Sequence, residues 1–324
     1  MSRKLLHFII FLIILSSVFI VSSLCYNKKC LFDLTSTKMS NYISQNPITN
    51  SEFTSNPDAT FNSEDNEHVT TIAFISDTHL NTAIFSKLKS SLDSEAPSLV
   101  IHTGDLSNFG TKTELSLARN DLQLLNYPYV AIPGDHDIAQ SSSDSNFKNF
   151  FSLPSYTNLS GVNILFLHNY YNFTYFTNDY LQNFLDLIEN SDIIVSSQPI
   201  FVPSDNIFSS KFMGSSEAFS DLNPTQIKNL QIYKSQRDAI LEKIKRVPNS
   251  LLVISGDHHR SSTFKDSEND KVLYHILGSL SEFIYFGNNK VSQKSLQSNR
   301  YTIVEIFRNK KSNEIRFNLK EIEI

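Results

Sequence analysis

The stretch LVIHTGD, residues 99–105, joins an apolar run to a Gly-Asp pair, and this pattern recurs along the chain. A short apolar run of this kind is typical of a strand that is buried on both faces. The same arrangement returns at VAIPGDHD (130–137) and LVISGDHH (252–259), and without the glycine at AFISDTH (73–79). Four apolar runs therefore each place a carboxylate at their C-terminal end, where open α/β sheets carry their sites.

The spacing of these carboxylates supports a repeated strand–helix–strand unit. Asp77 and Asp105 are 28 residues apart, and Asp105 and Asp135 are 30 residues apart, close to the roughly 30 residues of one βαβ unit. The chain has only eight glycines, yet three of them stand directly before aspartates of these blocks. A glycine there predicts a sharp turn as the chain leaves the strand.

The rest of the pattern predicts an α/β fold with two sheets and helices on the outside. Buried parallel strands are predicted at residues 70–75, 99–101, 129–132, 193–195 and 251–254. Apolar residues at helical spacing predict helices near residues 84–92, 115–125 and 181–188, the last with Asp179 as a cap. Asn223, Pro224 and Gln226 have the spacing of a helix start. Later strands are expected at 272–277, 301–307 and 315–319, the last two as a hairpin.

Composition excludes several classes of function. The net charge of −5 and the pI near 6.0 predict no basic, nucleic-acid-binding face. The two cysteines, Cys25 and Cys30, precede the predicted domain, so that domain has neither a thiolate metal site nor a cysteine nucleophile. The absence of H-E-x-x-H and G-x-S-x-G motifs argues against a metallopeptidase and a serine esterase.

The N-terminus predicts a membrane anchor. After Arg3 and Lys4, residues 5–24 are almost uninterruptedly apolar, and 20 helical residues span about 30 Å, the thickness of a bilayer core. We therefore expect residues 1–25 to be a transmembrane anchor, or else a signal segment cleaved near Ser23 or Cys25. A lipid on Cys25 is the third and weakest option.

Two further regions follow the anchor. Residues 26–68 are dominated by Ser, Thr and Asn and predict a flexible stalk, because they cannot bury enough surface to offset the entropy of ordering. Residues 69–324 are expected to form a single domain. The prediction is a single-pass membrane protein with its domain outside the cytoplasm, or a secreted protein if the segment is cleaved.

Clustered Asp and His side chains at one sheet edge predict a metal site. A single Gly-Asp after a strand would be interpreted as an ordinary turn. Four such blocks with three histidines are different, because unpaired buried carboxylates are costly and a cation is their simplest partner.

The blocks D-x-H (77–79), G-D (104–105), G-D-H-D (134–137) and G-D-H-H (256–259) resemble, in this order, the calcineurin-like metallophosphoesterases. The resemblance covers about residues 70–280. It implies a four-layer α-β-β-α sandwich of two mixed sheets, with a site for two divalent metal ions. The first ion, Fe, Mn or Zn, would be held by Asp77, His79, Asp105 and His259. Asp105 would bridge to the second ion.

The same resemblance implies two catalytic residues. His136 would contact the phosphate or protonate the leaving group, and Asp137 would orient His136. Other histidines on strand patterns are expected to be structural, namely His102, His168 and His275. His258 could swing in as a ligand and Arg260 could contact phosphate, but we expect His258 to face solvent and Arg260 to be an ordinary surface residue.

The second metal site departs from the family pattern at three positions. Asp135 stands where the family has Asn, Asp257 stands where it has His, and Ser197-Gln198-Pro199 lacks the usual lone His. The result is an acidic, all-oxygen pocket, to which Gln198 could add its carbonyl, and Mn or Mg is the expected ion. Two alternatives are carboxylates that share a proton without metal, and simple decay of the site.

Together these features predict a membrane-tethered phosphoesterase that hydrolyses a phosphomonoester or phosphodiester with metal-activated water. The alternative is a non-catalytic or single-metal surface binding domain of the same fold. The extra carboxylates lower the positive charge of the site, so we expect a slower enzyme, or one that needs a higher pH, than relatives with the usual ligands.

Overall fold

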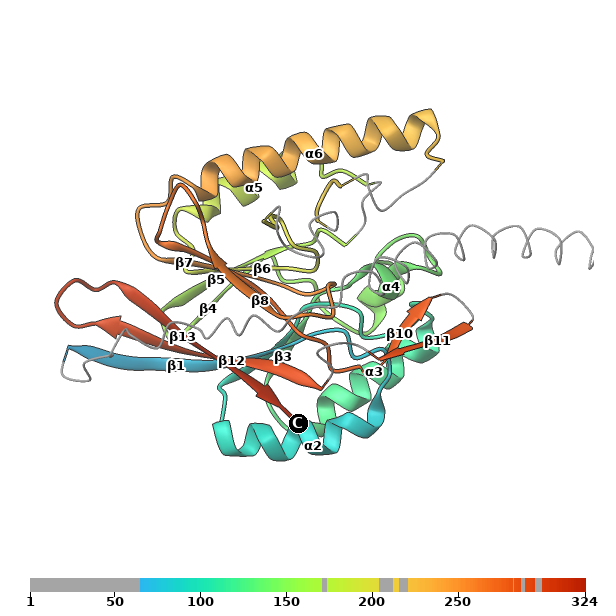
Figure 1. Ribbon diagram of the computed structural model, residues 1–324, viewed down its shortest axis with the longest axis horizontal. Helices are drawn as coiled ribbons and strands as arrows, with labels where there is room; N and C mark the ends of the chain where they lie inside the picture. Colours follow the sequence, from blue (N-terminus) through green and yellow to red (C-terminus); the bar gives the residue numbers. More distant parts are fainter. Residues whose placement is uncertain are drawn as a thin grey trace, which may run out of the picture. The chain divides into compact units, whose positions relative to one another are not determined.

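The computed structural model describes residues 65–170, 174–203, 212–215, 221–281, 283–286, 289–294 and 299–324 (Figure 1). One compact unit, residues 54–284 and 292–324, holds nearly all of the described elements. The predicted anchor at residues 1–25 and nearly all of the predicted stalk at 26–68 lie outside the described residues. Among the residues that are described, no helix combines the length and the apolar character needed to cross a bilayer.

The first sheet contains three of the predicted strands and the predicted hairpin. Its order is β13-β12-β1-β2-β3. Its strands are β1 (Asn66–Ile75), β2 (Leu99–His102), β3 (Tyr129–Ala131), β12 (Arg300–Asn309) and β13 (Ile315–Glu323). Strands β1, β2 and β3 are parallel, whereas β12 is antiparallel to both β1 and β13. The sheet is therefore mixed, and the hairpin prediction is confirmed.

The second sheet has the order β4-β5-β6-β7-β9-β8. Its strands are β4 (Tyr156–Leu159), β5 (Val162–Leu167), β6 (Ile193–Ser196), β7 (Leu251–Ser255), β8 (Ser262–Lys265) and β9 (Val272–Ile276). Strands β5, β6, β7 and β9 are parallel, and the edge strands β4 and β8 are antiparallel to their neighbours. Strands β4, β5 and β8 were not predicted from the sequence. The apolar run of β5 carried a readable signal, but both edge strands alternate between exposed and partly buried residues.

Helices cover the outer face of each sheet (Figure 1). The long helices are α2 (Thr82–Glu95), α3 (Lys112–Leu124), α5 (Asn178–Ile188) and α6 (Pro224–Ile244). Along β1, Ile72 and Phe74 enter the core between the sheets, whereas Ala73 and Ile75 pack with α2 and α3. A third core joins the other face of the second sheet to α5 and α6. Because successive side chains of a buried strand point to opposite faces, each sheet packs against the other sheet on one face and against helices on the other face. The result is the four layers α-β-β-α.

Local sequence explains most helix starts. Asn223 accepts a hydrogen bond from the Gln226 amide, and the Gln226 side chain accepts one from the Asn223 amide, so the predicted start of α6 is confirmed. At α5 the prediction is wrong by two residues. Thr177 is the cap, and Asp179 lies in the first turn, where its charge suits the helix dipole.

Short elements complete the fold. The single-turn helix α4 (Asp135–Ile138) follows β3, and a 3₁₀ turn, η1, covers Phe147–Asn149. Strands β10 (Phe283–Phe286) and β11 (Asn289–Lys294) pair only with each other among the described residues. Helix α4 begins inside the G-D-H-D block, so three of the four residues of the third strand-end motif are helical and Gly134 is the N-cap.

Candidate metal centre

Hydrogen bonds between backbones tie the strand-end loops together. The Asp77 amide donates to the Gly104 carbonyl at 3.1 Å, and the His79 amide donates to the Asp105 carbonyl at 3.0 Å. In the second sheet, the Gly256 amide donates to the Ser197 carbonyl at 3.0 Å. Within each sheet, these hydrogen bonds hold the loops that carry the predicted ligands in place relative to one another.

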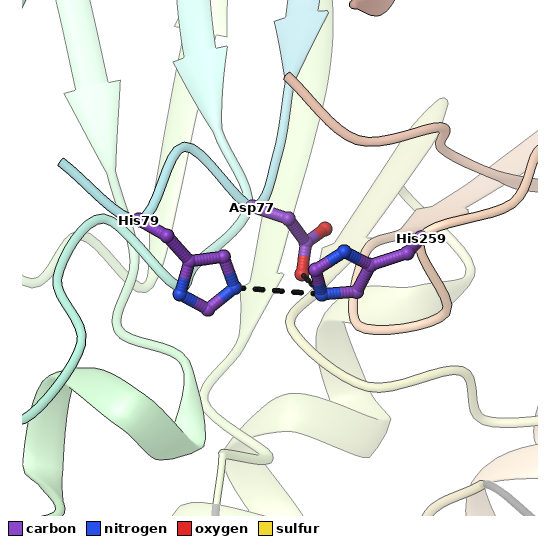
Figure 2. A group of neighbouring side chains, drawn as sticks. All are labelled: Asp77, His79 and His259. Carbon is purple, nitrogen blue, oxygen red and sulfur yellow. Dashed lines mark hydrogen bonds and ion pairs between the residues drawn. The ribbon is translucent and has the colours of Figure 1, made fainter. Parts of the chain in front are cut away.

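Asp77, His79 and His259 form the first ligand group (Figure 2). The Nε2 atom of His259 lies 3.2 Å from Asp77 Oδ1 and 3.4 Å from His79 Nε2. The Asp77 side chain is fully buried, yet neither of its oxygens accepts a hydrogen bond of ordinary geometry within the described residues. A buried carboxylate beside two imidazoles, without donors of its own, fits a divalent cation.

The ionisation states in this group also suit a cation. Burial by itself raises the pKa of Asp77, but the interaction with His259 outweighs burial and holds that pKa below its usual value. Burial, followed by the neighbouring His136 and His259, lowers the pKa of His79 well below its usual range. Asp77 is thus ionised and His79 neutral near pH 7, which are the forms that bind metal.

Asp105 links two further ligand groups. It forms one with His79 and His136, and another with Asp135 and Asp257, each with ligand atoms within 4.8 Å of one another. Burial, and then the charges of Asp135 and Asp77, raise the pKa of Asp105 well above its usual range. Three carboxylates that converge in this way repel one another, and a shared cation is the partner that relieves the repulsion.

Gln198 lies near the same edge, just after the end of β6. Ser196 of β6 pairs with Ser255 of β7, which places Gln198 beside the loop that carries Asp257. The Gln198 side chain is 5% exposed, and its Oε1 is buried without a hydrogen-bond partner within the described residues. Asn169 holds the backbone here, because its side chain accepts from the Ser197 and Gln198 amides and donates to the Gln198 carbonyl.

The backbone of the predicted ligands is unusual. Positive φ angles occur at Asp77 (53°), His79 (45°), Asp105 (58°), Asp257 (72°) and His259 (52°). This left-handed conformation costs a non-glycine residue roughly 1–2 kcal/mol, and such conformations cluster at functional sites. Nothing in the sequence pattern indicated it.

The glycines of these blocks serve two different needs. Gly104 has φ 125°, so the prediction of a turn that needs glycine holds there. Gly134 does not have a positive φ. A glycine is required there for a steric reason, because an added Cβ would lie 2.1 Å from Asp105 Oδ1. The close approach of the third strand end to Asp105 therefore depends on Gly134.

His136 and Asp137 do not interact as expected. His136 Nδ1 lies 2.9 Å from the carbonyl of Asn108, which orients the ring. The fully buried Asp137 instead accepts four hydrogen bonds, from the amides of Leu106, Ser107 and Gly134 and from the Ser107 hydroxyl. The prediction that Asp137 orients His136 directly is wrong, since Asp137 joins the second and third strand-end loops. Asn108 acts through its backbone, which residue type does not reveal.

Three histidines are structural, as predicted. His102 bonds Thr78 and the Gly104 amide, and His168 bonds the Pro154 carbonyl. His275 bonds two threonine hydroxyls. Burial lowers the pKa of His102 to about 3 and that of His275 to about 4, so both stay neutral near pH 7.

Of the two residues that flank His259, His258 differs from expectation and Arg260 does not. His258 is only 3% exposed, so the prediction that it faces solvent is wrong. The positive φ on both sides of it turns the chain so that His258 is enclosed by the domain. Arg260 is partly buried, and no carboxylate of the described residues lies within 4.0 Å of its guanidinium. Burial lowers the pKa of Arg260 from its usual value.

Comparisons with known proteins give one family match and one short match to a curated protein. The family model of the calcineurin-like phosphoesterases matches residues 70–221. The probable glycerophosphodiester phosphodiesterase GpdQ of Arcobacter nitrofigilis is 44% identical over 45 residues, 14% of this chain and 16% of that protein. The chain thus aligns with about one sixth of the length of this curated relative.

Solved structures provide two further likenesses. A dimetal phosphatase from Danio rerio gives a TM-score of 0.48 at 11% identity, over 79% of this chain and 99% of that chain. A purple acid phosphatase from seeds of yellow lupin (Lupinus luteus) gives 0.45 at 10% identity, over 78% and 53%. The family match makes residues 70–221 similar to the calcineurin-like phosphoesterases, and the strand-end residues Asp77, Asp105 and Asp135 lie within that range.

Proposed function

We propose that this protein is a metal-dependent hydrolase of phosphoesters that uses two divalent cations. The observation that carries the proposal is the chain of three ligand groups, joined through His79 and Asp105, at the ends of strands from both sheets. Divalent cations held there would polarise the phosphoryl group and lower the pKa of the attacking water.

The donor atoms differ between the two sites. Asp77, His79, Asp105 and His259 offer mixed nitrogen and oxygen ligands, which suit Fe, Mn or Zn. At the second site Asp105, Asp135 and Asp257 offer only oxygen. The buried Gln198 Oε1, which has no hydrogen-bond partner in the described part of the chain, is the proposed additional ligand. An all-oxygen set favours a hard cation, Mn or Mg.

His136 is the proposed acid for the leaving group. A carbonyl oxygen can only accept, so the contact with Asn108 keeps the proton of the neutral ring on Nδ1. His136 Nε2 then holds the transferable proton when the ring is charged, and His136 belongs to a ligand group with His79 and Asp105. Asp137 has an indirect role, because its hydrogen bonds hold the loops of Asp105 and Gly134 together.

The site is further proposed to lie outside the cytoplasm, on a membrane tether. The support is the apolar run at residues 5–24 and the polar segment at 26–68, both read from sequence. The test is cell fractionation with protease protection: a chain extracted by alkaline carbonate, or one digested only after the cells are opened, would contradict it.

The central experiment compares the detergent-solubilised full chain with its Asp105→Asn variant. Bound metal is measured by mass spectrometry, and turnover is measured on p-nitrophenyl phosphate, bis(p-nitrophenyl) phosphate and a glycerophosphodiester. The short match to a glycerophosphodiester phosphodiesterase motivates the last substrate. Asp121→Asn is the matched control, because Asp121 is another buried carboxylate but lies on α3.

The expected result is two cations per chain, with turnover that Asp105→Asn abolishes and Asp121→Asn keeps. One cation without turnover of any ester would instead favour the second candidate, a binding domain of the same fold. The departures from the family pattern at Asp135, Ser197-Gln198 and Asp257 are the observation that favours that candidate.

A further inference from the structure

The charges of the ligand groups balance those of two divalent cations. Four carboxylates belong to the groups, those of Asp77, Asp105, Asp135 and Asp257. Their four negative charges equal the four positive charges of two such ions. The histidine ligands add no charge when neutral, so the loaded centre has a net charge near zero.

A neutral centre treats phosphomonoesters and phosphodiesters differently from a positive one. A phosphomonoester carries about −1.5 to −2 charges at pH 7, because its second pKa is about 6. A phosphodiester has no second proton to lose and carries one negative charge. The additional charge of a monoester gains no net attraction from such a centre, whose second ligand group includes the exposed Asp135 and the partly exposed Asp257.

Arg260 brings one positive charge into the segment that carries Asp257 and His259. It directly follows His259, whose ring lies 3.2 Å from Asp77. It is partly buried, and no carboxylate of the described residues pairs with it within 4.0 Å. The planar guanidinium presents donors in a fork that matches two phosphate oxygens. A neutral centre with one available guanidinium matches a ligand of one negative charge.

We propose that this centre selects phosphodiesters over phosphomonoesters, with Arg260 as the residue that binds the non-bridging phosphate oxygens. The inference rests on the proposed function. In the reaction, a bond forms between phosphorus and the water oxygen, and the bond to one ester oxygen breaks. His136 provides the proton for the departing oxygen, and the water releases one. The product is a phosphomonoester with an additional negative charge, so the same selectivity favours its release.

The binding test uses the full chain in detergent, loaded with Mn²⁺, at pH 8. The ligands are dimethyl phosphate, with one negative charge, and methyl phosphate, with two, measured by isothermal titration calorimetry. The two ligands are close in size, so their affinity ratio reports charge. We expect dimethyl phosphate to bind at least about tenfold more tightly. Equal binding, or tighter binding of methyl phosphate, overturns the proposal.

Variants separate the two sources of charge. The double variant Asp135→Asn with Asp257→Asn removes two negative charges and should shift the affinity ratio toward methyl phosphate by at least about tenfold. Arg260→Gln should weaken dimethyl phosphate about tenfold, whereas Arg260→Lys should retain part of the affinity. Arg246→Gln is the matched control, because Arg246 is 75% exposed just beyond the C-terminal end of α6.

Metal content is measured on every variant, so that loss of an ion is not read as loss of selectivity. An unchanged ratio in the double variant with both ions bound overturns the proposal. Faster turnover of p-nitrophenyl phosphate than of bis(p-nitrophenyl) phosphate also overturns it, while the proposed function stands. Two bound ions without turnover of either ester contradict the proposed function, and the ligand ratio then still decides the inference about charge.

Discussion

Asp137→Asn should destabilise the domain and loosen the second metal site. Asp137 Oδ1 accepts from the amide and hydroxyl of Ser107, and Oδ2 accepts from the amides of Leu106 and Gly134. An asparagine keeps one oxygen and replaces the other with a donor. The asparagine loses least if its NH₂ group takes the place of Oδ1. The Ser107 hydroxyl can then rotate and accept a hydrogen bond from this NH₂ group, but the Ser107 amide has no acceptor left.

The magnitude follows from this count. Hydrogen bonds to a charged group contribute about 1.5–3 kcal/mol each, and a buried unsatisfied donor costs about 1–3 kcal/mol. Removal of the buried charge offsets part of the loss, since burial raises the pKa of Asp137. We expect the free energy of unfolding to fall by about 2–4 kcal/mol. Because Asp137 joins the loops of Asp105 and Asp135, affinity for the second cation should fall about 10- to 100-fold.

The assay is urea unfolding of the full chain followed by circular dichroism, together with metal titration by calorimetry. Asp121→Asn is the control, because the one hydrogen bond found for its carboxylate comes from the Thr82 hydroxyl at 2.9 Å, and an amide oxygen can accept it. That control should cost about 1 kcal/mol or less. Equal losses in the two variants, or unchanged second-metal affinity in Asp137→Asn, would refute the reasoning.

Three further predictions follow from single contacts. Gly134→Ala should abolish binding of the second cation, because the new Cβ would lie 2.1 Å from Asp105 Oδ1; calorimetry checks this, and normal binding would contradict it. His275 stays neutral in the fold down to about pH 4 but takes a proton near pH 6.5 when unfolded. The contribution of the neutral His275 to the free energy of unfolding is therefore fully present above pH 6.5. Up to about 3 kcal/mol of that free energy is lost as the pH falls from 6.5 to 4. Urea titrations should show a flatter acid dependence for His275→Gln. Gln198→Leu should weaken Mg²⁺ at the second site while leaving the first ion bound, and an unchanged Mg²⁺ affinity would remove Gln198 from the ligand set.

Much of the site could be read from the chain because its residues follow apolar strands. A buried strand leaves a run of β-branched and aliphatic residues, and the residue after it is forced to the sheet edge. That local rule was enough to pick out Asp77, Asp105 and Asp135, which the structure brings to one edge of the first sheet. The strands missed were those with weak alternation, such as β8.

The order of the motifs and the strand pattern alone therefore indicated the α/β fold, the resemblance to the calcineurin-like metallophosphoesterases and the candidate ligands. Only the tertiary structure decided how those ligands meet. Asp257 and His259 reach the site from the second sheet, and His259 lies 3.2 Å from Asp77 although 182 residues separate them in the chain. The left-handed backbone at the ligands, the space at Gly134 and the role of Asn108 also arise from contacts between distant loops. Such contacts leave no periodic trace in the sequence, because periodicity records only which face of an element is buried.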